Sequence, residues 1–207
     1  MRSHKAGFRG LSRPPFGYNR GYYEGLGGAG VSERMVADLG RLLDELAKGT
    51  EPMESENLAK LAEHVARVFE VEADEVAILV LVKKDRFLKF VIPEKLQAIG
   101  TIPMTSTSAL AVRTVREKRP ELVNNFTAAR HASVFEGVPL GRRPGELIHK
   151  IMSAPILLGD KVLGAVQISR KGRTPTEAGP DFAQKDLREL ISLSGTLGRF
   201  AQLCQVP

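Results

Sequence analysis

An irregular segment at residues 126–148 holds the residues best suited to bind a small molecule. Glycines and prolines recur through it, and so long a connection inside a compact domain is usually functional or partly helical. Arg130 could hold a carboxylate or phosphate with two parallel hydrogen bonds, and Phe126 and Phe135 flank it. Gln167, on an expected strand, is placed to face the same pocket. We expect a small anionic or planar ligand between the aromatic rings and the sheet, although loop arginines are often simply solvated.

Two histidines of the same region could serve as axial ligands of haem. His131 lies within the irregular segment and His149 lies at its end. The alternative is that both are surface or hydrogen-bonded loop histidines. Because no group of histidines and carboxylates has metal-ligand spacing, haem is the only metal-containing cofactor that we keep open.

The cysteine and glycine patterns argue against catalysis. Cys204 is the only cysteine, so the chain forms no internal disulfide and has no second thiol to resolve an oxidised one. The motif at residues 25–30 fits G-x-G-x-x-G, but no buried strand precedes it, so we interpret it as a flexible hinge. The sequence also lacks a P-loop and a nucleophile elbow. We therefore predict that the protein is not an enzyme.

Composition and charge divide the chain into parts. The 207 residues are 43% hydrophobic, and the longest apolar run, Val76–Val82, is far shorter than the roughly 20 residues of a membrane helix. With no secretory signal either, we expect a cytoplasmic protein without membrane contact. Residues 1–30 carry five basic side chains against one acidic, which is +4 of the net charge of +6. We predict a disordered basic Gly/Arg/Tyr leader there, a helix and linker at 31–52, and a domain at 53–207.

The expected elements must form a mostly antiparallel sheet. Helices are predicted at about 32–48, 55–69 and 105–118, and strands at 76–82, 87–92, 121–124, 150–158 and 161–170. Gly159-Asp160 is a strong two-residue hairpin signal between the last two strands. Adjacent antiparallel hairpins argue against a doubly wound parallel sheet.

A final helix over about 182–203 carries a heptad-like seam. Apolar and small residues recur at alternating steps of four and three, namely Ala183, Leu187, Leu190, Ser194, Leu197, Ala201 and Cys204. We expect Leu187, Leu190, Leu197 and Ala201 to form a homodimer interface. The alternative is that this stripe packs on the sheet of its own subunit.

Three stretches together resemble the GAF domain family. Residues 108–125 are similar to the family's helix leading into a central strand, residues 152–168 to its hairpin turning at Gly-Asp, and residues 182–203 to its closing helix. The resemblance implies an α+β fold with a central, mostly antiparallel sheet. The N- and C-terminal helices would cover one face, and residues 126–148 would cover a ligand pocket on the other.

Several ligand chemistries of that family do not suit this chain. The methionine-sulfoxide reductases of this fold need several cysteines, and covalent bilin attachment needs one near the pocket. Asn124-Asn125-Phe126 lacks the lysine and the acidic pair of the cyclic-nucleotide signature. Bilin and ordinary cyclic nucleotides are therefore disfavoured, and the ligand is unknown.

The sequence thus predicts a non-catalytic regulatory module. It would bind a small molecule and signal in trans, through its terminal helices, to an unknown downstream protein. One alternative is a ligand-free dimerisation or protein-interaction module. Another is a dimeric scaffold whose basic arm, residues 1–30, binds nucleic acid through phosphate attraction and base stacking.

Overall fold

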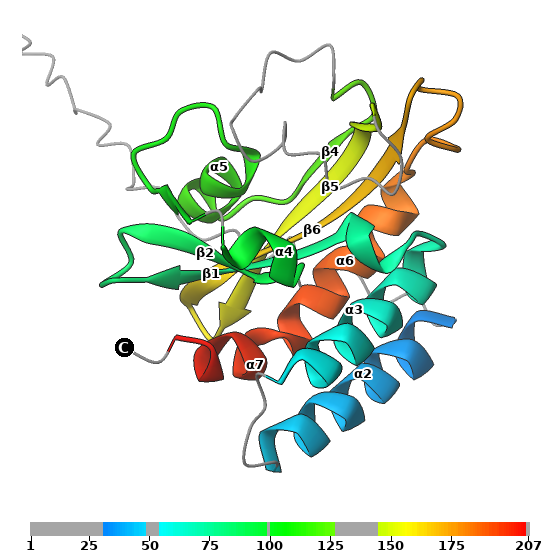
Figure 1. Ribbon diagram of the computed structural model, residues 1–207. Helices are drawn as coiled ribbons and strands as arrows, with labels where there is room; N and C mark the ends of the chain where they lie inside the picture. Colours follow the sequence, from blue (N-terminus) through cyan, green and yellow to red (C-terminus); the bar gives the residue numbers. More distant parts are fainter. Residues whose placement is uncertain (1–30, 49–53, 99, 127–144, 206–207) are drawn as a thin grey trace, which may run out of the picture.

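The computed structural model describes residues 31–48, 54–98, 100–126 and 145–205 (Figure 1). The basic leader, Arg130, His131 and Phe135 lie outside these ranges. The elements in chain order are α2 (Val31–Lys48), α3 (Ser55–Phe69), η1 (Ala73–Glu75), β1 (Val76–Val82), β2 (Phe87–Ile92), α4 (Glu94–Gln97), β3 (Thr101–Pro103), α5 (Leu110–Glu117), β4 (Glu121–Val123), β5 (Leu147–Leu158), β6 (Lys161–Gly172), α6 (Gln184–Thr196) and α7 (Gly198–Leu203).

The strands form one six-stranded sheet in the order β3-β2-β1-β6-β5-β4, and every neighbouring pair is antiparallel. The predicted hairpin between β5 and β6 is present and turns at Gly159, whose φ of 59° is the left-handed value that such turns require. The predicted antiparallel α+β fold is therefore confirmed.

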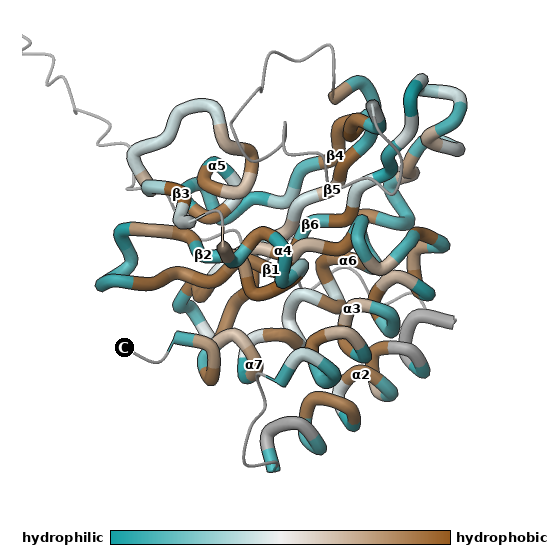
Figure 2. Tube along the Cα trace, viewed as in Figure 1, coloured by the Kyte–Doolittle hydropathy of each residue, from teal (hydrophilic) through white to brown (hydrophobic). Residues whose placement is uncertain are grey.

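Two layers of side chains cover the two faces of the sheet. Along β1, Ile78 and Val80 belong to the core under α2, α3, α6 and α7, whereas Leu79 and Leu81 belong to the core under α4 and α5. Successive strand side chains point to opposite faces, so a strand covered on both sides is apolar throughout. This explains the uninterrupted apolar run, which Figure 2 shows as a hydrophobic stretch along β1.

The helix α2 contributes to the same core as the rest of the domain. Leu39 and Leu43 are buried in the cluster that also contains the inner side chains of α3, α6 and the sheet. Figure 1 shows α2 in the layer of α3, α6 and α7 on one side of the sheet. The predicted placement of the first and last helices on one face is correct.

The side chains of the predicted dimer seam pack within their own chain, and dimerisation itself stays a prediction. Leu190, Leu197 and Ala201 are fully buried and Leu187 is 6% exposed, all in the core between α6, α7, α2 and the sheet. The alternative, that the stripe packs on its own sheet, is confirmed. These four side chains are thus unavailable to a second subunit.

The final helix is also not continuous. It is interrupted at Leu197, between α6 and α7, where the chain passes close to the end of β5. A Cβ atom on Gly198 would overlap the carbonyl oxygen of Leu157, whereas a Cβ on the exposed Gly195 would meet no atom within 4 Å. Of these two glycines, Gly198 is therefore the one that the close approach of helix and strand requires.

The two glycines give a matched test of this packing. Gly198→Ala should lower the free energy of unfolding by about 1–3 kcal/mol, because helix and strand must move apart. Gly195→Ala should raise it by about 0.5–1 kcal/mol, since alanine is the better helix former. Urea unfolding followed by circular dichroism measures both, and equal effects of the two substitutions would contradict the close contact.

Candidate functional site

A small cavity lies on the face of the sheet that carries α4 and α5. Its volume is about 50 Å³, well below the roughly 300–1,000 Å³ of pockets for drug-sized ligands. The wall is mostly apolar and is formed by Ala77, Phe90, Pro93, Leu96, Ile102, Ala109, Ala111, Ile148 and Ile151. The polar end is formed by Asp74, Glu75, Gln167, Ser169 and Lys171. This combination suits a ligand of a few atoms with one polar end.

Strand alternation explains why the polar groups gather at one end. Gln167, Ser169 and Lys171 follow one another at steps of two along β6 and therefore share a face. Val166 precedes Gln167, and Ile168 lies between Gln167 and Ser169. Both lie in the core on the helix side of the sheet. The sequence analysis identified Gln167 but missed Ser169 and Lys171, although the alternation of polar and apolar residues after Ala165 was a readable signal.

A buried hydrogen-bonded chain starts at Gln167. Its amide nitrogen Nε2 donates to Ser153 Oγ at 3.3 Å, and Ser153 Oγ lies 2.8 Å from Thr114 Oγ1. Thr114 Oγ1 in turn donates to the carbonyl oxygen of Leu110 at 3.0 Å. Gln167 pairs with Ala77 on one side and with Ser153 on the other, so the chain links β6, β5 and α5 beneath the cavity.

Glu75 fastens the short helix η1 to β6 at the polar end. Its Oε1 accepts the backbone N–H of Lys171 at 2.5 Å, and its Oε2 accepts the backbone N–H of Glu72 at 2.9 Å. Ser169 Oγ donates to the Glu75 carbonyl oxygen at 3.1 Å, and the Lys171 ammonium donates to the carbonyl oxygen of Asp74. The sequence analysis did not identify Glu75, and the Glu-x-x-Glu spacing with Glu72 was its only local signal.

Burial raises the pKa of Glu75 above its ordinary value of 4.5. Asp74 raises the pKa further. The two backbone N–H donors and the charge of Lys171 lower it, but by less in total than burial and Asp74 together raise it. The Glu75 carboxyl group is therefore easier to protonate in the folded chain than in the unfolded one.

The other described candidate residues do not line the cavity. Phe126 is 4% exposed and packs with Leu110 and with Ile151, which is itself a lining residue. His149 is buried, and its Nε2 lies 3.1 Å from the carbonyl oxygen of Gly172. This contact agrees with the alternative of a hydrogen-bonded histidine, and the haem-ligand interpretation stays a prediction.

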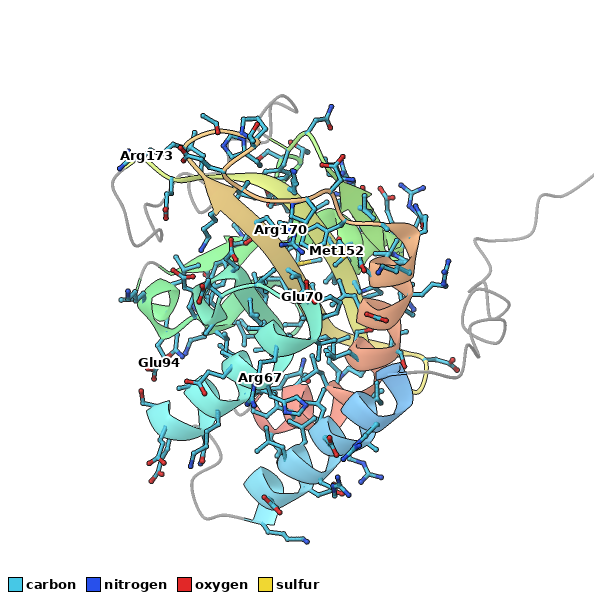
Figure 3. All side chains as sticks on the ribbon, turned by 90° about the vertical axis from the view of Figure 1, so that its right-hand side faces the viewer. Arg67, Glu70, Glu94, Met152, Arg170 and Arg173 are labelled. Atoms are coloured by element: carbon cyan, nitrogen blue, oxygen red, sulfur yellow. The ribbon has the colours of Figure 1, made fainter. Side chains whose placement is uncertain are left out.

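A second, open hollow lies at the same end of the sheet. It has a volume of about 500 Å³ and is lined by carboxylates together with Arg170 and Lys171. Arg170 serves a structural purpose there, since it donates to the carbonyl oxygens of Phe69 and Glu70 at the end of α3 and lies over the ring of Phe182. Figure 3 shows Arg170 beside Glu70. Within the described ranges, no three His, Cys, Asp or Glu side chains are grouped to hold a metal ion.

Cys204 is far from the cavity in the fold. It packs against the core on the helix side of the sheet, and burial raises the pKa of its thiol to about 12. It is therefore a thiol, not a thiolate, near neutral pH. Among the described helices, none has the length and apolar character needed to cross a membrane.

Comparisons with known proteins support the fold alone. No protein-family model matches the chain, and no curated protein matches it. The GAF domain of a phosphoenolpyruvate-protein phosphotransferase from Acinetobacter is 12% identical, with a TM-score of 0.59 over 86% of this chain and 96% of that one. The nlh2 GAF domain of A. aeolicus in an inactive state is 13% identical, with a TM-score of 0.55 over 84% and 97% of the two chains.

An enzyme shares this fold as well. The free methionine-R-sulfoxide reductase of Neisseria meningitidis is 12% identical, with a TM-score of 0.54 over 84% of this chain and 92% of that one. The protein therefore has the fold of a GAF domain. The regulatory or catalytic role must be argued from its own residues.

The raised pKa of Glu75 predicts a pH effect of defined sign. The unfolding free energy of the wild type minus that of Glu75→Gln should fall as pH rises from 4.5 to the folded-state pKa, because the folded chain binds the proton more tightly there. Asp74, Glu72 and Lys171 are present in both proteins, so their own titrations largely cancel in the difference. Urea unfolding at a series of pH values measures it, and a difference that grows with pH would contradict the prediction.

Proposed function

We propose that this chain is a non-catalytic regulatory module that binds a small molecule in the cavity between the sheet and α4 and α5. The observation that carries the proposal is the cavity itself, with a mostly apolar wall and polar groups gathered at one end. Ligand sites commonly combine such a wall with a few placed polar groups.

The position of Cys204 supports a non-catalytic role. A reductase that works through a thiol needs a thiolate beside its substrate and a second thiol to resolve the intermediate. This chain has one cysteine, which lies on the other face of the sheet and has a raised pKa. This chain therefore shares the fold of the Neisseria reductase but does not have the cysteine arrangement that such a role would need.

The sheet offers a route from the cavity to the helices. In β6, Gln167 and Ser169 line the cavity, while Val166 and Ile168 pack in the core under α3 and α6. A ligand that favours one setting of β6 would also favour one packing of the helices. We propose the helix layer as the surface that signals to a downstream protein.

A homodimer remains part of the proposal, but on different surfaces from those first expected. Because Leu187, Leu190, Leu197 and Ala201 are buried, a second subunit would have to use outward-facing side chains of the helix layer. Sedimentation equilibrium measures the oligomeric state directly, and a monomer at all concentrations would remove dimerisation from the proposed mechanism.

The ligand-free interaction module is the second candidate. The observation that favours it is the small volume of the cavity, about 50 Å³. In that case the domain would act through its surface only.

Filling the cavity distinguishes the two candidates. Ala77→Leu places a larger side chain beside Gln167, whereas Ala73→Leu enlarges a half-buried alanine that packs on the helix-side core. Fragments small enough for the cavity should shift the backbone amide signals of residues 77 and 167 in ¹⁵N–¹H spectra. The shifts should disappear in Ala77→Leu and persist in Ala73→Leu. If no fragment shifts these signals in the wild type, the ligand-free module is the better description.

The cysteine gives an independent check on catalysis. With a pKa of about 12, Cys204 should react with iodoacetamide at pH 8 at least about a hundred times more slowly in the folded protein than in urea. Mass spectrometry of the intact chain counts the label without ambiguity, since there is only one cysteine. Equal rates in both conditions would show a reactive thiol and reopen the enzyme hypothesis.

A further inference from the structure

The hydrogen-bonded chain beneath the cavity fixes which end of the Gln167 amide faces the ligand. All three contacts can be hydrogen bonds at once in only one arrangement: the Thr114 hydroxyl donates to the Leu110 carbonyl oxygen, which can only accept, and Thr114 Oγ1 accepts from the Ser153 hydroxyl. Ser153 Oγ, having given its proton, accepts from Gln167 Nε2. With the amide reversed, one of these three contacts would no longer be a hydrogen bond. The carbonyl oxygen of Gln167 is therefore left to the cavity as an acceptor.

Each of the other donor groups at the polar end has at least one partner within the chain. The hydroxyl of Ser169 donates to the Glu75 carbonyl oxygen, and the backbone N–H of Lys171 donates to the Glu75 carboxylate. The Lys171 ammonium donates to the carbonyl oxygen of Asp74. What these groups offer to a ligand is mainly oxygen lone pairs.

The charges at the polar end also favour a ligand that donates hydrogen bonds. Two carboxylates, Asp74 and Glu75, and one ammonium, Lys171, are the ionisable groups among the described lining residues. A bound anion would face two carboxylates against one ammonium, whereas a bound cation would face a majority of opposite charge together with acceptor oxygens. This preference is opposite to the anionic ligand that Arg130 suggested from the sequence.

We propose that the cavity selects small molecules with N–H donors, of the ammonium and amidinium class, and discriminates against carboxylates of the same shape. The inference rests on the proposed function and specifies its ligand. The volume of about 50 Å³ is a few times the roughly 10–15 Å³ that one water molecule needs and far below that of a drug-sized pocket, so the part of the ligand that enters has only a few non-hydrogen atoms. A ligand of about four non-hydrogen atoms gains at most about 6 kcal/mol, so its dissociation constant is at best in the range of tens of micromolar.

Acetamidinium and acetate make a matched pair for the test, because they share a planar shape and differ in charge and in donors. Each is titrated into the ¹⁵N-labelled full chain at constant ionic strength and pH 7. The backbone signals of residues 77, 167 and 169 and the side-chain amide signal of Gln167 are followed. Acetamidinium should shift these signals with a dissociation constant at least about tenfold below that of acetate, the factor expected for one charge-assisted hydrogen bond.

A serine pair tests whether the hydrogen-bonded chain sets the preference. In Ser153→Ala, the Gln167 amide loses its acceptor and can turn over, so the preference for acetamidinium should fall several-fold. Ser194→Ala is the control, since Ser194 is an equally buried serine on the helix side whose hydroxyl donates to the carbonyl oxygen of Ile191. It should keep the wild-type preference. If Ser153→Ala does not fold, Gln167→Glu replaces it and should strengthen the preference, because a carboxylate is purely an acceptor.

The outcomes separate this inference from the proposed function. Shifts caused by acetate but not by acetamidinium would overturn the inference and still support a ligand cavity. If neither compound shifts the signals at these positions, the inference is overturned, and the result also counts against the cavity as a ligand site. An unchanged preference in Ser153→Ala would overturn the assignment of selectivity to the hydrogen-bonded chain.

Discussion

The alternation of side chains along β6 is the constraint on which the rest of the structure depends. Every second residue, including Val166 and Ile168, packs under the helices, and the residues between them, Gln167 and Ser169, form the floor of the cavity. A shift of register by one residue would exchange the two sets and place polar groups in the helix-side core. The long pairing with β5, from Leu147 opposite Gly172 to Leu158 opposite Lys161, fixes that register. Packing and cavity chemistry are therefore set by the same hydrogen-bonded hairpin.

Several polar groups of the cavity are bonded within the protein itself, and the proposed ligand preference follows from this. Glu75, Ser169 and Lys171 bond to one another or to the backbone of η1, and Gln167 bonds to Ser153. Such a network is costly to disturb because each buried group would lose its partner. The proposed ligand would therefore use the lone pairs that remain and would not compete for bonds already formed.

Local signals predicted the fold well, whereas the site depended on contacts between distant segments. The hairpin at Gly159 and the two-sided burial of Val76–Val82 follow from turn chemistry and from an unbroken apolar run. The seam in α6 and α7 left two interpretations open in the sequence, because a helix that packs on a sheet and under α2 repeats apolar residues at the same steps as a coiled coil. Glu75 could not be assigned to the cavity from sequence, since its partner Lys171 lies 96 positions away. Gln167 was identified because the strand pattern alone placed its side chain on the cavity side of the sheet.

The strand order also has a consequence for how the chain folds. The hairpins β1–β2 and β5–β6 are local, but the centre of the sheet joins Val76–Val80 to Gly164–Ile168, across more than eighty intervening residues. Closing so long a loop precedes the gain from the contacts, so this pairing is expected to be the slow, late event. During synthesis, the apolar β1 edge stays open until β6 has left the ribosome. The first half of this domain therefore has the greatest need of protection from aggregation while it is being made.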